Sequence, residues 1–301
     1  MWSFSLTLTI CHKSSKQSRN LMQATRLSVA LVTRNRPVSL ERTLKSLRGQ
    51  SVQPWEAIVS DDSEEAQARE MERIALAYDC RYLRGPGRGL YANRNHAALA
   101  CSGTHIRTMD DDHEFPDAHF AECRKALDDD PGSIWIIGEY YPDTKDRRAP
   151  PPCPAQLHPR GFSSAPEDPD RCWAISDGAS IYPRIVFDRG IRYVERFKFG
   201  AAYLELGSRL YWLGYRIRQL RTTYVIHHFD PLARSFADPK DEMSSRFFAM
   251  LCHAYTYQPT LTNKLLCALE LAKQGITHSR IAGPALMTAL DQYRRYSPSP
   301  V

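Results

Sequence analysis

The sequence predicts an α/β fold, in which helices flank a doubly wound and mostly parallel β-sheet. Runs of residues that favour strands alternate with helical segments through the first half of the chain, and this alternation is typical of parallel sheets. The first run, 26–33, is almost continuously apolar, as expected of a parallel strand that is buried on both faces. The composition is that of a globular protein, with 43% hydrophobic and 25% charged residues among 301, which is enough chain for one large domain.

Several predicted strands, separated by helices, make up the first half of the chain. The first helix begins at Pro37, because proline suits the first helical position, and it carries Leu40, Leu44 and Leu47 on one stripe. A glycine-rich loop, 85–89, precedes the third helix. The predicted strands cover 26–33, 55–60, 80–83, 105–109 and 133–140, and the later helices cover 64–78, 91–100 and 116–128.

A proline-rich segment, 142–172, interrupts this alternation. It contains eight of the 20 prolines of the chain, and a loop of this length within a compact domain is usually a lid, a binding loop or disordered. We expect this segment to be mobile in the free protein and to become ordered when a ligand binds.

After the loop, the sequence predicts a strand, a helix, a second strand and then helices only. The first of these helices carries Leu206, Leu210 and Leu213 on one face and ends before Gly214, since glycine often follows the last helical turn. The two strands cover 176–183 and 215–228, and the helices after Pro231 cover 244–255, 262–273 and 284–296.

Composition and charge argue against several classes of protein. No run approaches the roughly 20 apolar residues that span a bilayer, and the N-terminus lacks the pattern of a secretory signal. The eight cysteines are scattered without a CxxC pair, which argues against a zinc site or a disulfide framework. The basic residues concentrated in 1–48 lack the interleaved aromatics of a nucleic-acid-binding face. We therefore expect a soluble, cytoplasmic protein that does not bind nucleic acid.

Three consecutive aspartates, Asp110, Asp111 and Asp112, follow the fourth predicted strand. Three like charges in one turn are unfavourable unless a positive charge compensates them. Hard cations such as Mg²⁺ and Mn²⁺ prefer carboxylate oxygens and also bind phosphates. The carboxyl ends of the strands in such a sheet are where ligands bind, so the triplet predicts a metal site beside a phosphate-containing ligand.

Three stretches of the sequence look like successive motifs of one enzyme family. They are VALVTRNRPVSLERTLKSLRGQ, WEAIVSDDSEE and GRGLYANRNHAALACSGTHIRTMDDDHEFP. In this order and at these spacings they resemble the opening strand and helix, the nucleotide-binding aspartates and the metal-binding DxD motif of the family 2 glycosyltransferases, which have the GT-A fold. The resemblance covers residues 27–228.

The resemblance also implies how the chain is divided. A GT-A domain would occupy 26–230, with a nucleotide-sugar-binding half at 26–140 and an acceptor half at 173–230, separated by the proline-rich loop or lid at 142–172. The segment 1–25 would be a disordered N-terminal extension, and 231–301 would form a helical C-terminal extension.

For the nucleotide, the resemblance implies contacts from the first two strand ends and the third helix. Either Asp61 or Asp62 would accept a hydrogen bond from the nucleobase, since uracil and guanine present ring N–H donors. Thr33 and Arg34 would lie beside this carboxylate. Arg94 would point toward the nucleotide from the helix.

For the metal, the resemblance implies Mn²⁺ or Mg²⁺ at the DxD motif. Asp112 would be the direct ligand, and Asp110 would lie nearer the ribose. His227 and His228 follow a predicted strand where this fold often supplies a late histidine, and imidazole is a ligand for such ions. The sequence does not decide which of the two histidines faces the metal.

The expected reaction is a single displacement that inverts the anomeric carbon, with a carboxylate as the general base. Here the sequence departs from the family, because Ala202 and Tyr203 occupy the positions of its Glu-Asp pair. Glu205 lies about one turn away and is a candidate base, although it could instead form an i,i+4 ion pair with Arg209. Asp177 is a second candidate.

The donor would be a nucleotide diphosphate sugar, and the acceptor a hydroxyl of a glycan, a lipid-linked molecule or a small molecule. The C-terminal helices suggest a homo-oligomer contact or a peripheral membrane contact. The loss of the acidic pair leaves open a nucleotide-sugar-binding protein without turnover. A nucleotidyltransferase is the third alternative, but residues 33–37 lack the glycine-rich, lysine-bearing phosphate loop that it would need.

Overall fold

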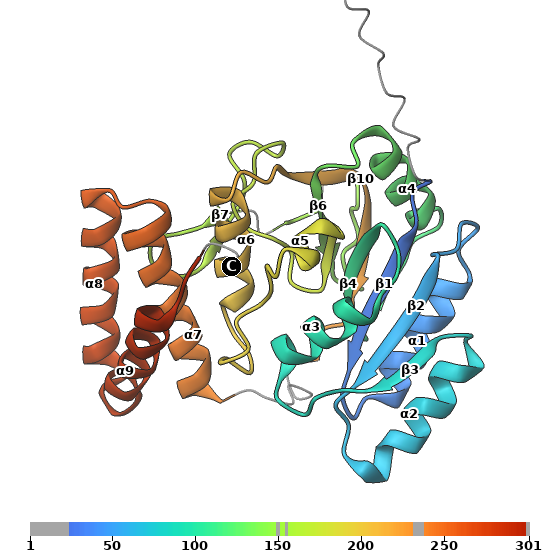
Figure 1. The fold of residues 1–301 in the computed structure, drawn as a ribbon, viewed down its shortest axis with the longest axis horizontal. Coiled ribbons are helices and arrows are strands. Elements are labelled where there is room, and N and C mark those ends of the chain that lie inside the picture. Colours follow the sequence, from blue (N-terminus) through green and yellow to red (C-terminus); the bar gives the residue numbers. More distant parts are fainter. Residues whose placement is uncertain (1–23, 149–150, 154–155, 231–237, 299–301) are drawn as a thin grey trace, which may run out of the picture.

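The computed structural model describes residues 24–148, 151–153, 156–230 and 238–298 (Figure 1). It confirms the predicted α/β class, because one large and mostly parallel sheet is flanked by helices and a C-terminal group of helices lies beside it (Figure 1). Residues 1–23 of the expected N-terminal extension lie outside the described residues.

Eight strands of the described chain form the main sheet. They are Leu27–Thr33 (β1), Glu56–Asp61 (β2), Arg81–Arg84 (β3), His105–Asp110 (β4), His113–Glu114 (β5), Ile134–Tyr140 (β6), Ala179–Pro183 (β9) and Ile217–His227 (β10). Their order is β3-β2-β1-β4-β9-β6-β10-β5. The pairs β1–β2, β1–β4, β2–β3 and β6–β10 are parallel, whereas β9 runs antiparallel to both β4 and β6.

The register of the parallel strands brings the predicted site residues together. Thr33 at the end of β1 is level with Asp61 at the end of β2, and the neighbouring Val32 is level with Asp110 at the end of β4. The carboxyl ends of three strands therefore meet at one edge of the sheet, as the sequence predicted.

Helices cover both faces of this sheet. They are Pro37–Arg48 (α1), Glu65–Ala77 (α2), Leu90–Ala100 (α3), His119–Asp129 (α4), Ile185–Asp188 (α5), Ala202–Trp212 (α6), Pro239–Cys252 (α7), Leu261–Thr277 (α8) and Ser279–Arg295 (α9), with a π-helical turn at His253–Tyr257. Val29 and Leu31 of β1 belong to a core shared with α1, α2 and α4. Ala30 and Val32 belong to a second core shared with α3, α6 and α7. Both faces of β1 are buried, which explains its continuous apolar sequence.

Some elements differ from the sequence prediction. The strand β5 was not expected, because it has only two residues and its partner β10 is distant in the sequence. The fourth helix begins at His119 rather than at Pro116. In the C-terminal part, α8 continues past Gly275 and α9 begins before Pro284. A glycine costs a helix only about 1 kcal/mol relative to alanine, which the remaining contacts of α8 offset.

The segment 142–172 contains some regular structure. Gln156–Leu157 (β7) and Ser163–Ser164 (β8) form a small hairpin apart from the main sheet. Before it, Pro151 packs against Gly138 of β6, so closely that a side chain at Gly138 would clash. That the segment 142–172 becomes ordered when a ligand binds stays a prediction.

The C-terminal helices are continuous with the core of the α/β domain. Phe247 and Phe248 of α7 are buried in the same cluster as Leu206 and Leu210 of α6, and α9 packs against α7. Among the described residues, no helix combines the length and the apolar composition that crossing a membrane requires.

Candidate active site

A cavity of about 520 Å³ lies at the carboxyl ends of β1 and β4. Of the residues singled out from the sequence, the cavity is lined by Thr33, Arg34, Asp62, Asp110, Asp112, Asp177 and His227. The others, Asp61, Arg94, Glu205 and His228, are not among the described residues that line it. Five separate parts of the chain therefore contribute predicted residues to one cavity.

The middle aspartate of the triplet, Asp111, holds the turn in place. Its side chain is fully buried, accepts a hydrogen bond from Thr33 Oγ1 at 2.6 Å and pairs with the guanidinium of Arg36. Thr43 Oγ1 donates to the backbone oxygen of Asp111 at 2.7 Å. Burial raises the pKa of Asp111 to about 7, although the charge of Arg36 opposes this shift. Arg36 thus compensates part of the negative charge that led us to expect a cation.

Asp112 faces the cavity between positive groups. Its carboxylate lies 3.0 Å from Arg36 Nη1 and 3.6 Å from His227 Nε2. Burial alone would raise its pKa, but His227, His113 and Arg36 lower the pKa of Asp112 well below its usual range. The carboxylate is therefore ionised and can bind a cation.

His227 is fixed by a second carboxylate, Glu139 of β6. The distance from His227 Nδ1 to Glu139 Oε2 is 2.9 Å. Burial would lower the pKa of His227, but the carboxylates of Asp112 and Glu139 raise it to about 11, so a cation that binds Nε2 would displace a proton. His228 instead contacts Glu114 at 2.7 Å through Nε2, so His227 is the histidine that reaches the cavity.

Asp112, His113 and His227 could together hold a metal ion. One ligand atom from each lies within 4.8 Å of the other two. Asp112 Oδ1 and both ring nitrogens of His113 are buried without a hydrogen-bond partner among the described residues. Unpaired carboxylate and imidazole donors suit Mn²⁺ or Mg²⁺, so these residues fit the expected cation.

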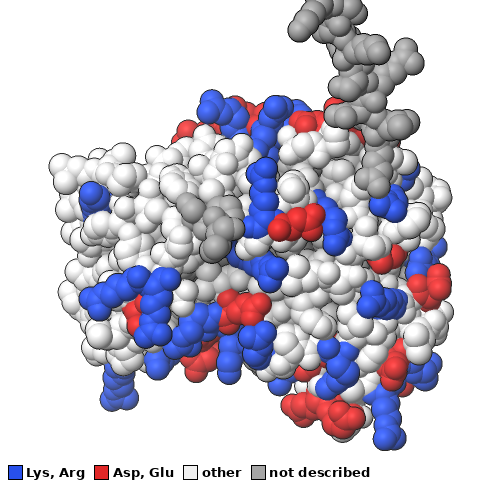
Figure 2. Space-filling view, in the orientation of Figure 1, with Lys and Arg blue, Asp and Glu red and all other residues white. Residues whose placement is uncertain are grey.

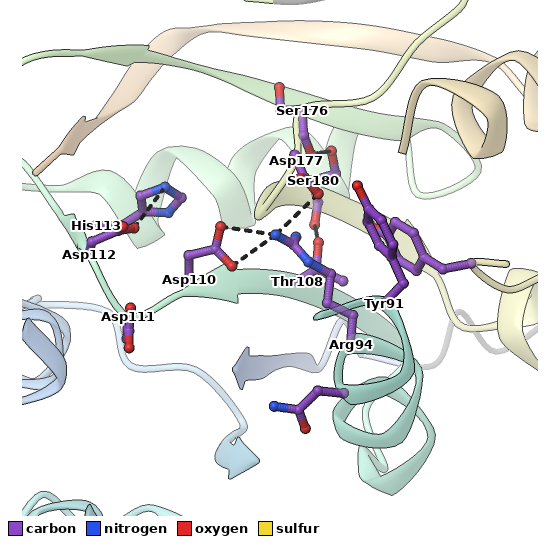
Figure 3. Close-up of polar contacts among 12 residues, drawn as sticks. Tyr91, Arg94, Thr108, Asp110, Asp111, Asp112, His113, Ser176, Asp177 and Ser180 are labelled. Carbon is purple, nitrogen blue, oxygen red and sulfur yellow. Dashed lines mark hydrogen bonds and ion pairs between the residues drawn. The ribbon is translucent and has the colours of Figure 1, made fainter. Parts of the chain in front are cut away.

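Arg94 of α3 contacts the carboxylates of Asp110 and Asp177 (Figure 3). Its Nη2 lies 2.9 Å from each oxygen of Asp110 and 3.1 Å from Asp177 Oδ1. Burial raises the pKa of Asp177 to about 7, and the charge of Arg94 opposes the shift. The Arg94 side chain is fully buried. It therefore orients Asp110 and Asp177 and is not placed to contact a ligand.

The two aspartates that follow β2 point in different directions. Asp61 is buried and accepts hydrogen bonds from Tyr82 Oη at 2.8 Å and from Arg84 Nη1 at 3.2 Å. Asp62 lines the cavity, and its Oδ1 accepts a hydrogen bond from the backbone N–H of Gly87 at 2.8 Å. Its Oδ2 is buried without a partner among the described residues, so Asp62 is the aspartate that can receive a donor from a ligand.

Glu205 lies outside the cavity, in a buried cluster between α6 and the C-terminal helices. Tyr257 Oη donates to Glu205 Oε1 at 2.5 Å, the hydroxyl of Tyr296 also donates to it, and Arg209 Nε lies 3.4 Å from it. The side chain is fully buried. This geometry corresponds to the ion pair that the sequence left open and speaks against Glu205 as the base.

The far side of the cavity is built by residues that the motifs did not indicate. It is lined by Gly161, Phe162 and Ser163 near the β7–β8 hairpin, by Phe199, Gly200, Ala201, Tyr203 and Leu204 around the start of α6, and by Glu242 and Arg246 of α7. Because α7 belongs to the C-terminal extension, no spacing within the motifs could have indicated Glu242. Arg36 and His113, by contrast, lie within the quoted motifs and could have been noticed.

Solved structures with a similar fold include two that contain bound UDP. The structure of S. aureus TarS 1–349 in complex with UDP has a TM-score of 0.57 and 16% identity, and the match covers 83% of this chain and 72% of that chain. The structure of GalNAc-T7 with UDP, GalNAc and Mn²⁺ has a TM-score of 0.61 and 15% identity, and the match covers 79% of this chain and 52% of that chain. At these identities the likeness shows the fold.

Sequence comparisons add evidence on the family to which the chain belongs. The GalNAc(5)-diNAcBac-PP-undecaprenol beta-1,3-glucosyltransferase of Campylobacter jejuni is 32% identical over 97 residues, which are 30% of this chain and 30% of that relative. The match thus spans less than a third of the relative's length. The model of the family described as "Glycosyl transferase family 2" matches residues 28–191, more than half of the chain. Because this match covers more than half of the chain, the chain belongs to glycosyl transferase family 2.

Proposed function

We propose that this glycosyltransferase moves a sugar from a nucleoside diphosphate donor to an acceptor hydroxyl, with a divalent cation and with inversion of the anomeric carbon. The observation that carries the proposal is the meeting of Asp62, Asp110 and Asp112 at one cavity, although they follow strands that are far apart in the sequence. A nucleoside diphosphate needs both hydrogen-bond acceptors for its base and ribose and compensation for its negative charge.

The nucleotide would lie along the ends of β1, β2 and β4. The unpaired Oδ2 of Asp62 supports a hydrogen bond from a ring N–H of the nucleobase. Arg94 holds both oxygens of Asp110, which would keep that carboxylate oriented toward the ribose. Thr33 and Arg34 line the cavity beside them. UDP is the first nucleotide to test, because the TarS and GalNAc-T7 structures contain it.

The diphosphate would lie next to Asp112, His113 and His227. Mn²⁺ or Mg²⁺ held by these residues would neutralise the diphosphate as it leaves. The chain itself places the positive charge of Arg36 beside Asp112 and lets Glu139 orient the His227 ring. Such partners of ligand residues commonly affect metal affinity by about 10–100-fold.

The transfer would be a single displacement. The acceptor oxygen attacks the anomeric carbon from the face opposite the diphosphate, a carboxylate takes the hydroxyl proton, and the bond to the diphosphate breaks. General-base help of this kind is typically worth about 10²–10⁴-fold. Asp177 is the candidate base from the sequence that lines the cavity.

The acceptor could be a glycan, a lipid-linked molecule or a small molecule. The Campylobacter relative is named for an undecaprenol-linked acceptor, which supports testing lipid-linked acceptors first. Only a short part of that relative matches, so its acceptor is a starting point for the experiment.

We expect the protein to release UDP from at least one UDP-sugar in a panel assayed with Mn²⁺, and to lose this activity in EDTA. Release is measured as free nucleoside diphosphate over time, with and without candidate acceptors. Product analysis by NMR would reveal inversion through the anomeric coupling constant.

Two other outcomes would contradict the proposal. Thermal stabilisation by UDP-sugar and Mn²⁺ without any diphosphate release would indicate a binding protein, the alternative favoured by Ala202 and Tyr203. Formation of pyrophosphate from a nucleoside triphosphate and a sugar phosphate would indicate a nucleotidyltransferase.

Exposed apolar side chains on the outer face of α8 support the proposal that this helix contacts a second copy of the chain. Leu261, Leu265, Leu269 and Ile276 form one stripe and are 84%, 57%, 52% and 83% exposed. Figure 2 shows that uncharged residues dominate the surface in this part of the molecule. Lys264 and Lys273 are the helix's basic residues, few for a helix that lies on an anionic membrane.

We expect Leu265→Glu combined with Leu269→Glu to shift the protein from dimer to monomer in sedimentation velocity, because the charges would lie within the contact. Leu76→Glu, which changes an exposed leucine on α2, serves as the control and should leave the dimer intact. A monomeric parent that co-sediments with anionic liposomes, and loses this property with the double substitution, would replace the dimer by a membrane contact.

A further inference from the structure

We propose that Glu242 of α7 is the general base of the transfer, so that the C-terminal extension supplies the carboxylate that the start of α6 lacks. This inference rests on the proposed function. It concerns the residue that takes the proton, not the donor or the metal.

The cavity needs a carboxylate on the side away from the nucleotide. At the positions of the family's acidic pair, Ala202 is fully buried and Tyr203 lines the cavity with a phenol instead of a carboxylate. Burial raises the pKa of Tyr203 above its usual range, so the phenol stays protonated and is unsuited to accept a proton. The base must therefore come from another element.

The first turns of α7 are fixed against the segment that precedes α6. Asp241 Oδ2 accepts hydrogen bonds from the backbone N–H groups of Lys198 at 2.6 Å and Phe199 at 3.3 Å. Ser245 Oγ accepts one from the N–H of Ala201 at 2.8 Å. These contacts hold the start of α7 beside the start of α6, where the acidic pair would otherwise lie.

Gly200 makes this close approach feasible. A β-carbon at Gly200 would lie 3.1 Å from the Cα of Glu242, and the backbone φ there is +106°, which favours glycine. Glu242 lies between the two anchoring residues Asp241 and Ser245, and it lines the same cavity as Tyr203. The backbone of Glu242 is thus positioned by contacts that leave its side chain available.

The Glu242 carboxylate is also chemically available. It is exposed, and within the described part of the chain it has no hydrogen-bond or ion-pair partner. The other candidate, Asp177, is paired with Arg94 at 3.1 Å. A base must accept a proton as the acceptor oxygen attacks, and the Glu242 carboxylate can do so without breaking an ion pair.

In the proposed step, proton transfer to Glu242 accompanies the transfer of the sugar. One oxygen of the Glu242 carboxylate takes the proton of the acceptor hydroxyl while the acceptor oxygen forms its bond to the anomeric carbon. The bond from that carbon to the diphosphate oxygen breaks, and its electron pair leaves with the diphosphate.

The test compares Glu242→Gln with the parent protein, using a UDP-sugar that the parent hydrolyses with Mn²⁺. We expect release of UDP to water to fall by about 10²-fold or more. Azide is already an anion and needs no base, so release of UDP with formation of the glycosyl azide should stay within a few-fold of the parent. UDP affinity and the melting temperature should be unchanged, because the Glu242 carboxylate has no partner among the described residues.

Glu122→Gln is the matched control. It also removes a carboxylate from the first turn of a helix, α4, which lies away from the cavity, and it should leave both rates unchanged. If the parent does not use azide, formate added to Glu242→Ala decides instead, since rescue of hydrolysis supports the base and its absence overturns it.

Other results would overturn the assignment. Equal loss of hydrolysis and azide transfer in Glu242→Gln would make Glu242 a binding residue. Asp230 also lines the cavity. A selective loss of hydrolysis in Asp177→Asn or Asp230→Asn, with Glu242→Gln active, would show that the substituted aspartate is the base. A parent that releases no UDP from any donor would refute the proposed function itself, which is a different result from a change confined to Glu242→Gln.

Discussion

Asp112→Asn is expected to abolish Mn²⁺-dependent binding of UDP and, with it, sugar transfer. The substitution removes the one ionised carboxylate of the Asp112–His113–His227 cluster. Since even the partners of metal ligands are commonly worth about 10–100-fold in affinity, loss of a ligand should weaken binding by about 10²-fold or more. Isothermal titration calorimetry with UDP, in Mn²⁺ and in EDTA, measures the effect directly.

The fold should survive this change, because Asp111 and not Asp112 holds the turn through Thr33 and Arg36. Asp128→Asn, at an exposed aspartate of α4, is the control and should bind like the parent. Partial loss of UDP affinity in Asp110→Asn, with Mn²⁺ dependence retained, would agree with a ribose contact. An Asp112→Asn protein that still binds UDP in a Mn²⁺-dependent manner would show that the metal assignment is wrong.

Glu205→Ala is expected to lower stability strongly and to leave UDP binding intact at temperatures where the variant is folded. The substitution leaves Arg209 buried without its charge partner and removes the acceptor of two tyrosine hydroxyls. Breaking a buried pair costs about 3–5 kcal/mol. For a chain of this size that corresponds to a decrease in Tm of roughly 10 °C, which differential scanning calorimetry measures.

A comparison with an exposed ion pair tests whether the burial of Glu205 causes the expected loss of stability. Glu70 of α2 lies 2.7 Å from Arg73 on the surface, and Glu70→Ala should hardly change Tm, because exposed pairs contribute little. Glu205→Gln should be milder than Glu205→Ala, since it retains an acceptor for the tyrosine hydroxyls. A Glu205→Gln protein with parental Tm but turnover reduced by about 10²-fold would return the role of base to Glu205.

The C-terminal helices are part of the core and of the cavity, although they follow the predicted GT-A domain in the sequence. They share a core with α6, bury Glu205 through Tyr257 and Tyr296, and bring Glu242 to the cavity. The stability of this part of the fold and the side of the cavity that Glu242 lines therefore depend on α6, α7 and the segments that carry Tyr257 and Tyr296.

Local sequence was sufficient to predict the sheet and the edge where the site lies. The alternation of apolar runs and amphipathic helices determines the fold class, because each strand must be buried by its neighbours. Parallel pairing brings Thr33 level with Asp61 and Val32 level with Asp110. Glycine at 214, with φ of +88°, ends α6 as predicted.

The direction of individual side chains could not be predicted in this way. Asp61 and Asp62 are adjacent and chemically identical, and only the positions of Tyr82, Arg84 and Gly87 separate a structural carboxylate from one that faces the cavity. His227 and His228 differ in the same manner, since they meet Glu139 and Glu114, which come from different strands.

For the acidic residues in the second half of the chain, too, the sequence did not predict which side chains face the cavity. Helical spacing allowed Glu205 to replace the missing pair, but tertiary packing places Tyr257 and Tyr296 around it and excludes it from the cavity. Glu242 reaches the cavity only because α7 docks on Gly200. The sequence by itself determined the fold and the edge of the sheet where the cavity lies, because the motifs there are local. Only the tertiary structure decided which carboxylates face the cavity, because that depends on contacts between segments far apart in the chain.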